Sequence, residues 1–229
     1  MILALMRSSL LFLAMLVVAA PALAQPTIGV KAGLNVADVL FSDDIGFGED
    51  GIDDQPRLGV VGGVTVDVPF TPTVGARVEA LFAQKGYAIE FDTELFGERI
   101  EGKQMLKLDY LEVPILANLT FPMQSGLEIG VQAGVAPAFL LSDGIGCSGF
   151  ETEEGSGCDE LEDEEDLSVN SFDLGLAAGA TVGAGPFAVD LRYTYGLTNL
   201  DDREVSGNDE DFTARNGVFS VTGVYRFGR

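Results

Sequence analysis

Residues Lys107 to Phe121 read KLDYLEVPILANLTF, and this stretch decides the fold class. From Leu111 onward, every second side chain is apolar, whereas the intervening positions include the polar residues Glu112 and Asn118. A period of two is typical of a β-strand, because successive side chains point to opposite faces. The stretch therefore predicts a strand with one continuous apolar face, and the kind of protein depends on whether that face meets lipid or a protein interior.

Seven further segments show the same alternation, so the sequence predicts eight strands. They span Thr27 to Val36, Arg57 to Pro69, Thr73 to Phe91, Gly126 to Leu140, Ser168 to Ala184, Phe187 to Thr198 and Ala214 to Phe227. The pattern shifts near Lys85 and Gly86, where a β-bulge would explain it. Lys107, Asp109 and Glu112 cannot share one face without a slip, which predicts another bulge between Asp109 and Glu112.

The connections between these segments are of two kinds. Three are short and rich in turn-forming residues: Phe70 to Pro72, Pro122 to Ser125, and Gly185 with Pro186. The other four are long: Ala37 to Pro56, Asp92 to Gln104, Leu141 to Leu167, and Asn199 to Thr213. Strict alternation places all long loops at one end, as in outer-membrane barrels with short periplasmic turns. The predicted fold is all-β, an eight-stranded antiparallel up-and-down transmembrane β-barrel.

The first 24 residues are typical of a secretory signal. They contain Arg7, an apolar stretch from Leu10 to Ala20, and Ala22-Leu23-Ala24 as an A-x-A cleavage site. Residues 25–229 then form one barrel domain of about 205 residues. No later apolar run reaches the roughly 18 residues of a spanning helix, so a membrane-crossing mature chain would cross as strands. We predict localisation in the bacterial outer membrane.

Charged residues on the predicted strands are few and fall on the polar faces. They are Lys31, Asp67, Arg77, Glu79, Glu112, Glu128, Asp173, Asp190, Arg192 and Arg226. An eight-stranded barrel is just wide enough for side chains to fill it, and a low-dielectric interior tolerates charges that are paired. We therefore expect a plugged, salt-bridged interior, with Glu112 directed towards Arg77, and an apolar outer face against lipid.

Acidic residues concentrate in the long loops. The net charge is -23, and the loops hold 28 of the 36 Asp and Glu residues. Such acidity repels phosphates, so nucleic acid is not an expected partner. The densest run, in the third loop, comprises Asp159, Glu160, Glu162, Asp163, Glu164, Glu165 and Asp166. It fits either a surface site for divalent cations or a solvated acidic loop, and its lack of EF-hand spacing favours the second interpretation. A high-salt habitat also explains the acidity.

Cys147 and Cys158, the only cysteines, lie in the same loop. In an exported protein such a pair predicts a disulfide that closes a surface hairpin. Metal binding by the pair is disfavoured because the chain has no His. The lack of His also excludes Ser-His-Asp triads, so we expect a non-enzyme without a cofactor or a metal centre.

Three stretches resemble a known family: GVKAGLN from Gly29, KLDYLEVPILANL from Lys107, and the end YRFGR. They are similar to the outer-membrane β-barrel family of porin-like proteins, with the eight-stranded architecture of the OmpA and OmpX barrels. The resemblance implies that the C-terminal strand carries the signal for the barrel-assembly machinery. That signal usually ends in an aromatic residue, whereas here Gly228 and Arg229 follow Phe227.

These observations predict a monomeric, non-enzymatic envelope protein that contacts outer-membrane lipid and presents acidic loops outside. One alternative is a narrow, passive, porin-like channel. A second alternative is a soluble, lipocalin-like carrier of an apolar ligand. Aromatic residues near the strand ends suit the interfacial girdles of a membrane barrel, although the lack of Trp weakens this argument.

Overall fold

The computed structural model describes residues 25–41, 52–95, 98–123, 126–148, 151–152, 155–156, 169–200 and 214–228. Its strands are β1 (Thr27–Phe41), β2 (Ile52–Pro69), β3 (Val74–Leu95), β4 (Glu98–Glu112), β5 (Ile115–Pro122), β6 (Leu127–Ser148), β7 (Glu151–Thr152), β8 (Gly155–Ser156), β9 (Phe172–Ala184), β10 (Phe187–Gly196) and β11 (Ala214–Arg226). Among the described residues, no helix is long and apolar enough to cross a bilayer.

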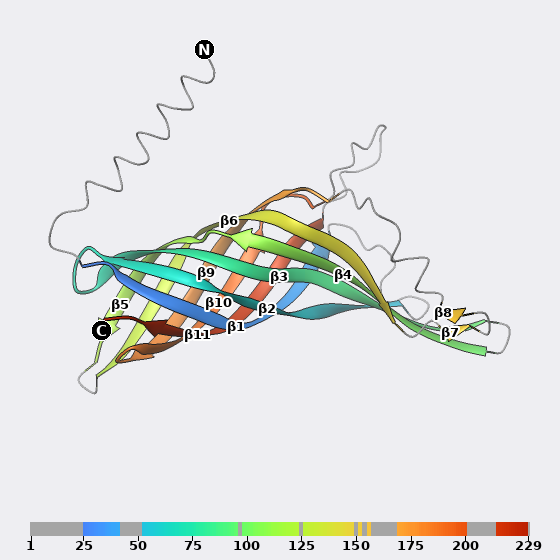
Figure 1. The fold of residues 1–229 in the computed structure, drawn as a ribbon, viewed down its shortest axis with the longest axis horizontal. Helices are drawn as coiled ribbons and strands as arrows, with labels where there is room; N and C mark the ends of the chain where they lie inside the picture. Colours follow the sequence, from blue (N-terminus) through green and yellow to red (C-terminus); the bar gives the residue numbers. More distant parts are fainter. Residues whose placement is uncertain are drawn as a thin grey trace, which may run out of the picture.

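The long strands pair in a closed ring (Figure 1). Neighbours in sequence are antiparallel throughout, and β1 pairs with both β2 and β11, which joins the two ends of the sheet. Counting β4 and β5 as one, eight strands form the ring. The predicted eight-stranded antiparallel barrel is therefore confirmed, while β7 and β8 form a separate small hairpin.

The segment Lys107 to Phe121 contains a break that its alternation did not predict. β4 ends at Glu112 and β5 begins at Ile115, with Val113 and Pro114 between them. The register is the same on both sides of the break, because Glu112 faces Leu81 and Ile115 faces Val78 on β3. The break occurs because Pro114 has no N–H to donate to the neighbouring strand. Because the register continues across it, β4 and β5 act as one barrel strand.

The first predicted bulge is found in the pairing of β2 with β3. The register shifts between Pro56 and Val61, opposite Gly86. On β3, buried side chains occupy odd positions up to Lys85 and then change phase to Ala88. Gly86 has φ of 123°, and a Cβ there would come 2.0 Å from a backbone oxygen of β4, so the shift requires glycine.

The second predicted bulge has the expected position but a different cause. Asp109 faces Ser142 and Tyr110 faces Leu140, so the additional residue is Leu141 on β6. β4 itself keeps its alternation from Leu108 onward, with no slip before Glu112. The prediction treated Lys107 and Asp109 as inward residues, whereas both are in the outward phase.

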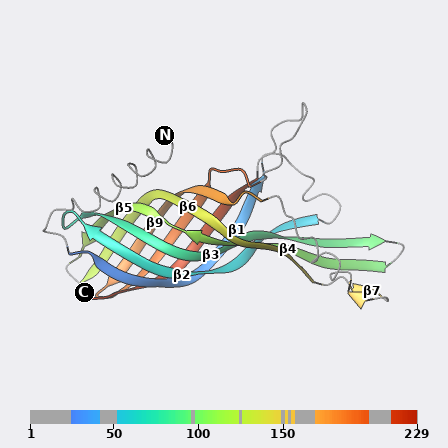
Figure 2. The same ribbon diagram turned by 45° about the horizontal axis from the view of Figure 1, so that its top comes forward.

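Several predicted loop boundaries are wrong, because β2, β3, β4 and β6 continue past the rest of the ring (Figures 1 and 2). Parts of the predicted loops Ala37 to Pro56, Asp92 to Gln104 and Leu141 to Leu167 are strand. Backbone pairing continues there, for example between Asp53 and Glu90. These residues lie beyond the apolar band of the barrel, so no apolar surroundings impose a period of two on the sequence.

Candidate functional site: the charged barrel interior

The structure places the ten predicted charged residues in the barrel interior. All but Asp67 and Glu128 are buried, and each takes part in an ion pair. An eleventh charge, Lys85, is 1% exposed and was not predicted. The interior of the described barrel therefore holds five bases and six acids, so its charge is almost balanced.

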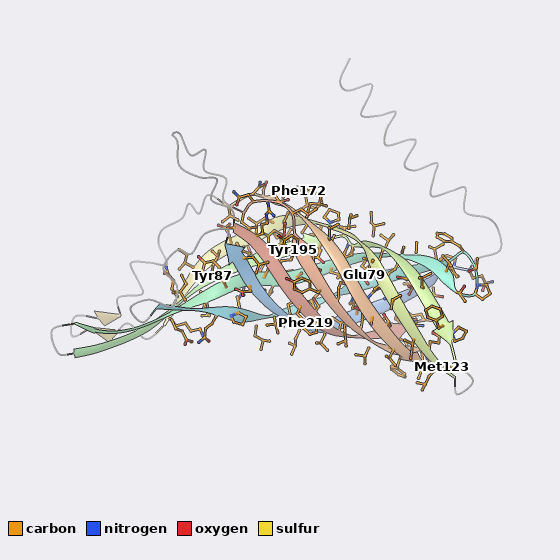
Figure 3. All side chains as sticks on the ribbon, turned by 180° about the vertical axis from the view of Figure 1, so that it is seen from behind. Glu79, Tyr87, Met123, Phe172, Tyr195 and Phe219 are labelled. Atoms are coloured by element: carbon orange, nitrogen blue, oxygen red, sulfur yellow. The ribbon has the colours of Figure 1, made fainter. Side chains whose placement is uncertain are left out.

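The largest group of these charges lies midway along the barrel. We call it the central cluster: Lys31, Asp67, Arg77, Glu79, Asp190 and Arg192. Figure 3 shows Glu79 between Tyr87 toward the long-loop end and Met123 at the short-turn end.

Glu79 and Asp190 each bind more than one cation. Arg192 Nη1 and Nη2 donate to the Glu79 carboxylate at 2.7 and 2.9 Å, and Lys31 Nζ lies 3.3 Å from Glu79 Oε1. Asp190 accepts from Lys31 at 3.2 Å and from Arg77 Nη1 at 3.2 Å. Such shared, charge-assisted bonds offset the cost of removing these groups from water.

The central cluster joins opposite walls of the barrel. Glu79 and Arg77 project from β3, whereas Asp190 and Arg192 project from β10. In the ring, three strands separate β3 from β10 in either direction, counting β4 and β5 as one. The direct N–O contacts between these residues therefore cross the full width of the lumen.

A second group of interior side chains lies closer to the long loops. Lys85 Nζ is 2.8 Å from Glu112 Oε2 and 3.5 Å from Asp173 Oδ2, and it lies 5.0 Å from the centre of the buried Tyr110 ring. Asn216 Nδ2 donates to Asp173 at 2.8 Å. The predicted direction of Glu112 into the lumen is correct, but its partner is Lys85 and not Arg77, which binds Asp67 at 2.7 Å.

A third group of interior charges, the pair of Arg226 and Glu128, lies at the short-turn end. Arg226 Nη1 on β11 donates to Glu128 Oε2 on β6 at 3.1 Å. Beside this pair, a cavity of about 140 Å³ lies between the short turns and the central cluster. The interior therefore contains polar contacts at three successive levels.

The outer face of the same strands is apolar. Leu111, Ile115 and Leu119 are 40, 50 and 44% exposed, whereas Glu112 between them is 6% exposed. Aromatic rings gather at both ends of the barrel. Contacting ring pairs are Phe187 with Tyr225 and Tyr225 with Phe227 at the short-turn end, and Phe139 with Phe172 toward the long loops, with centroids 5.1–5.4 Å apart. An apolar band between two aromatic girdles is the outer surface of a transmembrane barrel.

Some predicted features lie outside the described residues. These are the signal at residues 1–24, the acidic run from Asp159 to Asp166, and Cys158. The side chain of its predicted disulfide partner Cys147 is likewise not described. Within the part of the chain that is described, no group of three or more His, Cys, Asp or Glu side chains is arranged to hold a metal ion.

Sequence reasoning did not assign Lys85 or Tyr110 to the interior, nor Asn216 on β11. Lys85 continues the odd-numbered inward series of Arg77 and Glu79, but it stands directly before the phase shift. Tyr110 was assigned to no face, although it is two residues from the inward Glu112. Extending each alternating series to its last in-phase member would have identified Lys85 and Tyr110.

A closed ring of antiparallel strands, with paired charges inside and an apolar band outside, defines a transmembrane β-barrel. The outer membrane protein β-barrel domain matches residues 23–202, and the chain belongs to this family. The protein is therefore located in the bacterial outer membrane. The soluble, lipocalin-like alternative is wrong.

Solved structures of low sequence identity are similar over most of the chain. Ail, the attachment invasion locus protein of Yersinia pestis, in complex with the heparin analogue sucrose octasulfate, is 15% identical with a TM-score of 0.37, over 89% of this chain and 99% of that chain. Neisserial surface protein A is 13% identical with a TM-score of 0.42, over 89% and 99%. The outer membrane protein AlkL in DMPC bilayers is 14% identical with a TM-score of 0.34, over 87% and 90%. No curated protein matches the chain.

Proposed function

We propose that the protein is a non-enzymatic, monomeric envelope protein whose barrel is closed by ion pairs and holds acidic loops at the cell surface. The observation that carries this proposal is the bidentate contact of Arg192 with Glu79 across the lumen, at 2.7 and 2.9 Å. A hydrated ion that passes through the barrel would have to separate these two groups.

The spaces on either side of the central cluster support a closed barrel. Towards the long loops, the space lined by Lys31, Glu112 and Arg192 is about 10 Å³, which is room for one water molecule. Towards the short turns, the larger cavity ends at Arg77 and Gln132, and both of these side chains contact Asp190. Neither space supplies a continuous aqueous path.

Conductance in planar lipid bilayers tests the closed barrel. Purified wild-type protein is expected to give no single-channel steps at neutral pH. The double variant Glu79→Ala, Arg192→Ala keeps the net charge and removes the contact across the lumen, so narrow steps are expected. Reproducible steps from the wild type would contradict the proposal and favour the passive, porin-like channel.

The surface role is assigned to the acidic loops. The segments predicted as long loops hold 28 of the 36 Asp and Glu residues. For the run Asp159 to Asp166, a solvated acidic segment is the favoured interpretation, and binding of divalent cations at the membrane surface is the alternative. Equilibrium dialysis with Ca²⁺ tests this binding, with a variant that carries Asn and Gln throughout the run as the comparison. Equal Ca²⁺ binding by both proteins would remove the cation role.

Assembly is proposed to follow the family pattern. β11 is the last strand and pairs with β1 to close the ring, and it ends next to Phe227. We assign the signal for the barrel-assembly machinery to this strand. Deleting Gly228 and Arg229, so that Phe227 becomes terminal, is expected to preserve or improve assembly in cells.

A further inference from the structure

The outer face of the barrel is hollowed near the short-turn end. The hollow has a volume of about 520 Å³, and ligand pockets typically measure roughly 300–1,000 Å³. Strands β6 and β9 form one side of it, and outward side chains of β1, β10 and β11 form the other: Val30, Ala32, Phe187, Val189, Gly223 and Tyr225. Phe187 directly follows the short turn at Gly185 and Pro186. The hollow, which we call the outer groove, therefore lies in the periplasmic half of the apolar band.

Three neighbouring rows of side chains, each running across the strands, shape the outer groove. In the middle row, Ala32 pairs with Gly223, and Gly223 pairs with Val189. The rows on either side hold large side chains that are 39–63% exposed: Val30, Tyr225 and Phe187 toward the short turns, and Leu34, Val221 and Leu191 toward the long loops. The outer groove is therefore lowest over Ala32 and Gly223, between two raised rows.

Gly223 is not required to be glycine by the protein around it. A Cβ built on Gly223 would meet only the Ala32 carbonyl oxygen, at 3.9 Å, whereas a Cβ on Gly33 would come 2.1 Å from a backbone oxygen. Gly223 also lacks the positive φ of Gly86. Glycine weakens the interior of a strand and often marks the close approach of a ligand. The space above Gly223 is therefore open to a molecule outside the protein.

The surroundings of the outer groove determine what kind of molecule can fill it. Its outward side chains carry no charge, and its one charged lining residue, Lys31, is 3% exposed and points into the barrel. The groove is continuous with the apolar band, so lipid hydrocarbon reaches it directly. The convex wall of a second barrel would meet the two raised rows before it reached Gly223, whereas a single hydrocarbon chain is narrow enough to lie between them.

We infer that the outer groove binds one acyl chain of a lipid in the periplasmic leaflet. Because bilayer hydrocarbon is as apolar as these side chains, the contact is stabilised by packing and not by the exclusion of water. A chain in the groove touches side chains on both flanks and the strands beneath it. It therefore makes more dispersion contacts than a chain on a smooth part of the apolar band.

Native mass spectrometry of the folded protein in mild detergent, with added dimyristoyl phosphatidylglycerol, tests this binding. The wild type is expected to retain one lipid molecule. Ala32→Leu is expected to retain at least about tenfold less, because the larger side chain takes the place of part of the acyl chain and removes its contacts. The matched control is Ala117→Leu, the same substitution at an exposed position of β5 outside the groove, which should leave retention unchanged.

A second lipid separates recognition of the chain from recognition of the headgroup. Dimyristoyl phosphatidylcholine has the same chains without the net negative charge, and it is expected to be retained equally. Heat-modifiable gel migration verifies that each variant is folded. If Ala32→Leu does not fold, Gly223→Leu replaces it, since its added side chain enters open space, and the same loss of lipid is expected.

Four results would overturn the inference. The first is no lipid retained by the wild type, and the second is equal retention by Ala117→Leu and every folded groove variant. The third is retention that follows the charge of the headgroup. The fourth is a lipid-free dimer, which would assign the outer groove to a second copy of the chain.

Discussion

The inner and outer faces of the barrel strands follow opposite rules, and β10 shows the contrast most clearly. Asp190 and Arg192 are 0% and 3% exposed, whereas their neighbours Leu191 and Tyr193 are 43% and 45% exposed. A soluble barrel would bury the second pair and expose the first. The outer face is therefore suited to hydrocarbon. The charged side chains all point inward, away from bulk water, and each needs an oppositely charged partner inside the barrel.

Removing one interior charge is expected to have the largest effect on stability. Glu79→Gln keeps the size of the side chain but leaves Arg192 and Lys31 without their main partner in a dry interior. The free energy of unfolding should fall by about 3–5 kcal/mol, the usual effect of breaking a buried ion pair. Urea titration in phospholipid vesicles, followed by heat-modifiable migration, measures this change. A loss below about 1 kcal/mol would mean that water reaches the central cluster.

Placing a charge on the outer face is expected to have the next largest effect. Val131 is 47% exposed on β6, between the aromatic residues at the two ends of the barrel. Val131→Arg should destabilise the barrel by about 2–4 kcal/mol in vesicles, because the arginine enters hydrocarbon. The control Val131→Leu should change stability by less than about 0.5 kcal/mol. A tolerated arginine would show that this face is not covered by lipid.

A salt bridge beyond the apolar band is expected to contribute least. Lys103 Nζ lies 2.7 Å from Glu90 Oε1, but these side chains are 35% and 41% exposed. Glu90→Gln is the same substitution as Glu79→Gln on the same strand, and it should cost only about 0–1 kcal/mol. The same urea titration provides the measurement. Equal losses for the two substitutions would show that position in the barrel does not control the strength of these pairs.

The sequence predicted the strands well because lipid imposes a strict period of two on the membrane-spanning part. The same logic fails above the apolar band, where β3 continues to Leu95 and β6 to Ser148 although neither stretch alternates. The alternation of side chains therefore predicts which face of a strand meets lipid and which faces the barrel interior, but it does not predict how far backbone pairing extends.

Contacts across the lumen could not be predicted from local pattern. Arg77 and Asp190 are 113 residues apart in sequence, and they meet only because the stagger of the strands brings β3 and β10 to the same level. Glu112 was assigned to Arg77 as the base on the neighbouring strand, whereas the register places Lys85 beside it. The alternation along one strand predicts whether a side chain points inward, whereas the pairing register between strands determines which side chain it contacts.

Oxygen accessibility along β5 tests most directly which face of the strands meets lipid. Single nitroxide labels are placed from Ile115 to Leu119, in a background that carries Cys147→Ser and Cys158→Ser, and the protein is reconstituted in vesicles. Because oxygen concentrates in hydrocarbon, accessibility should be high at positions 115, 117 and 119 and low at 116 and 118. Maxima at 116 and 118, or no alternation, would contradict the assignment of the apolar face to lipid.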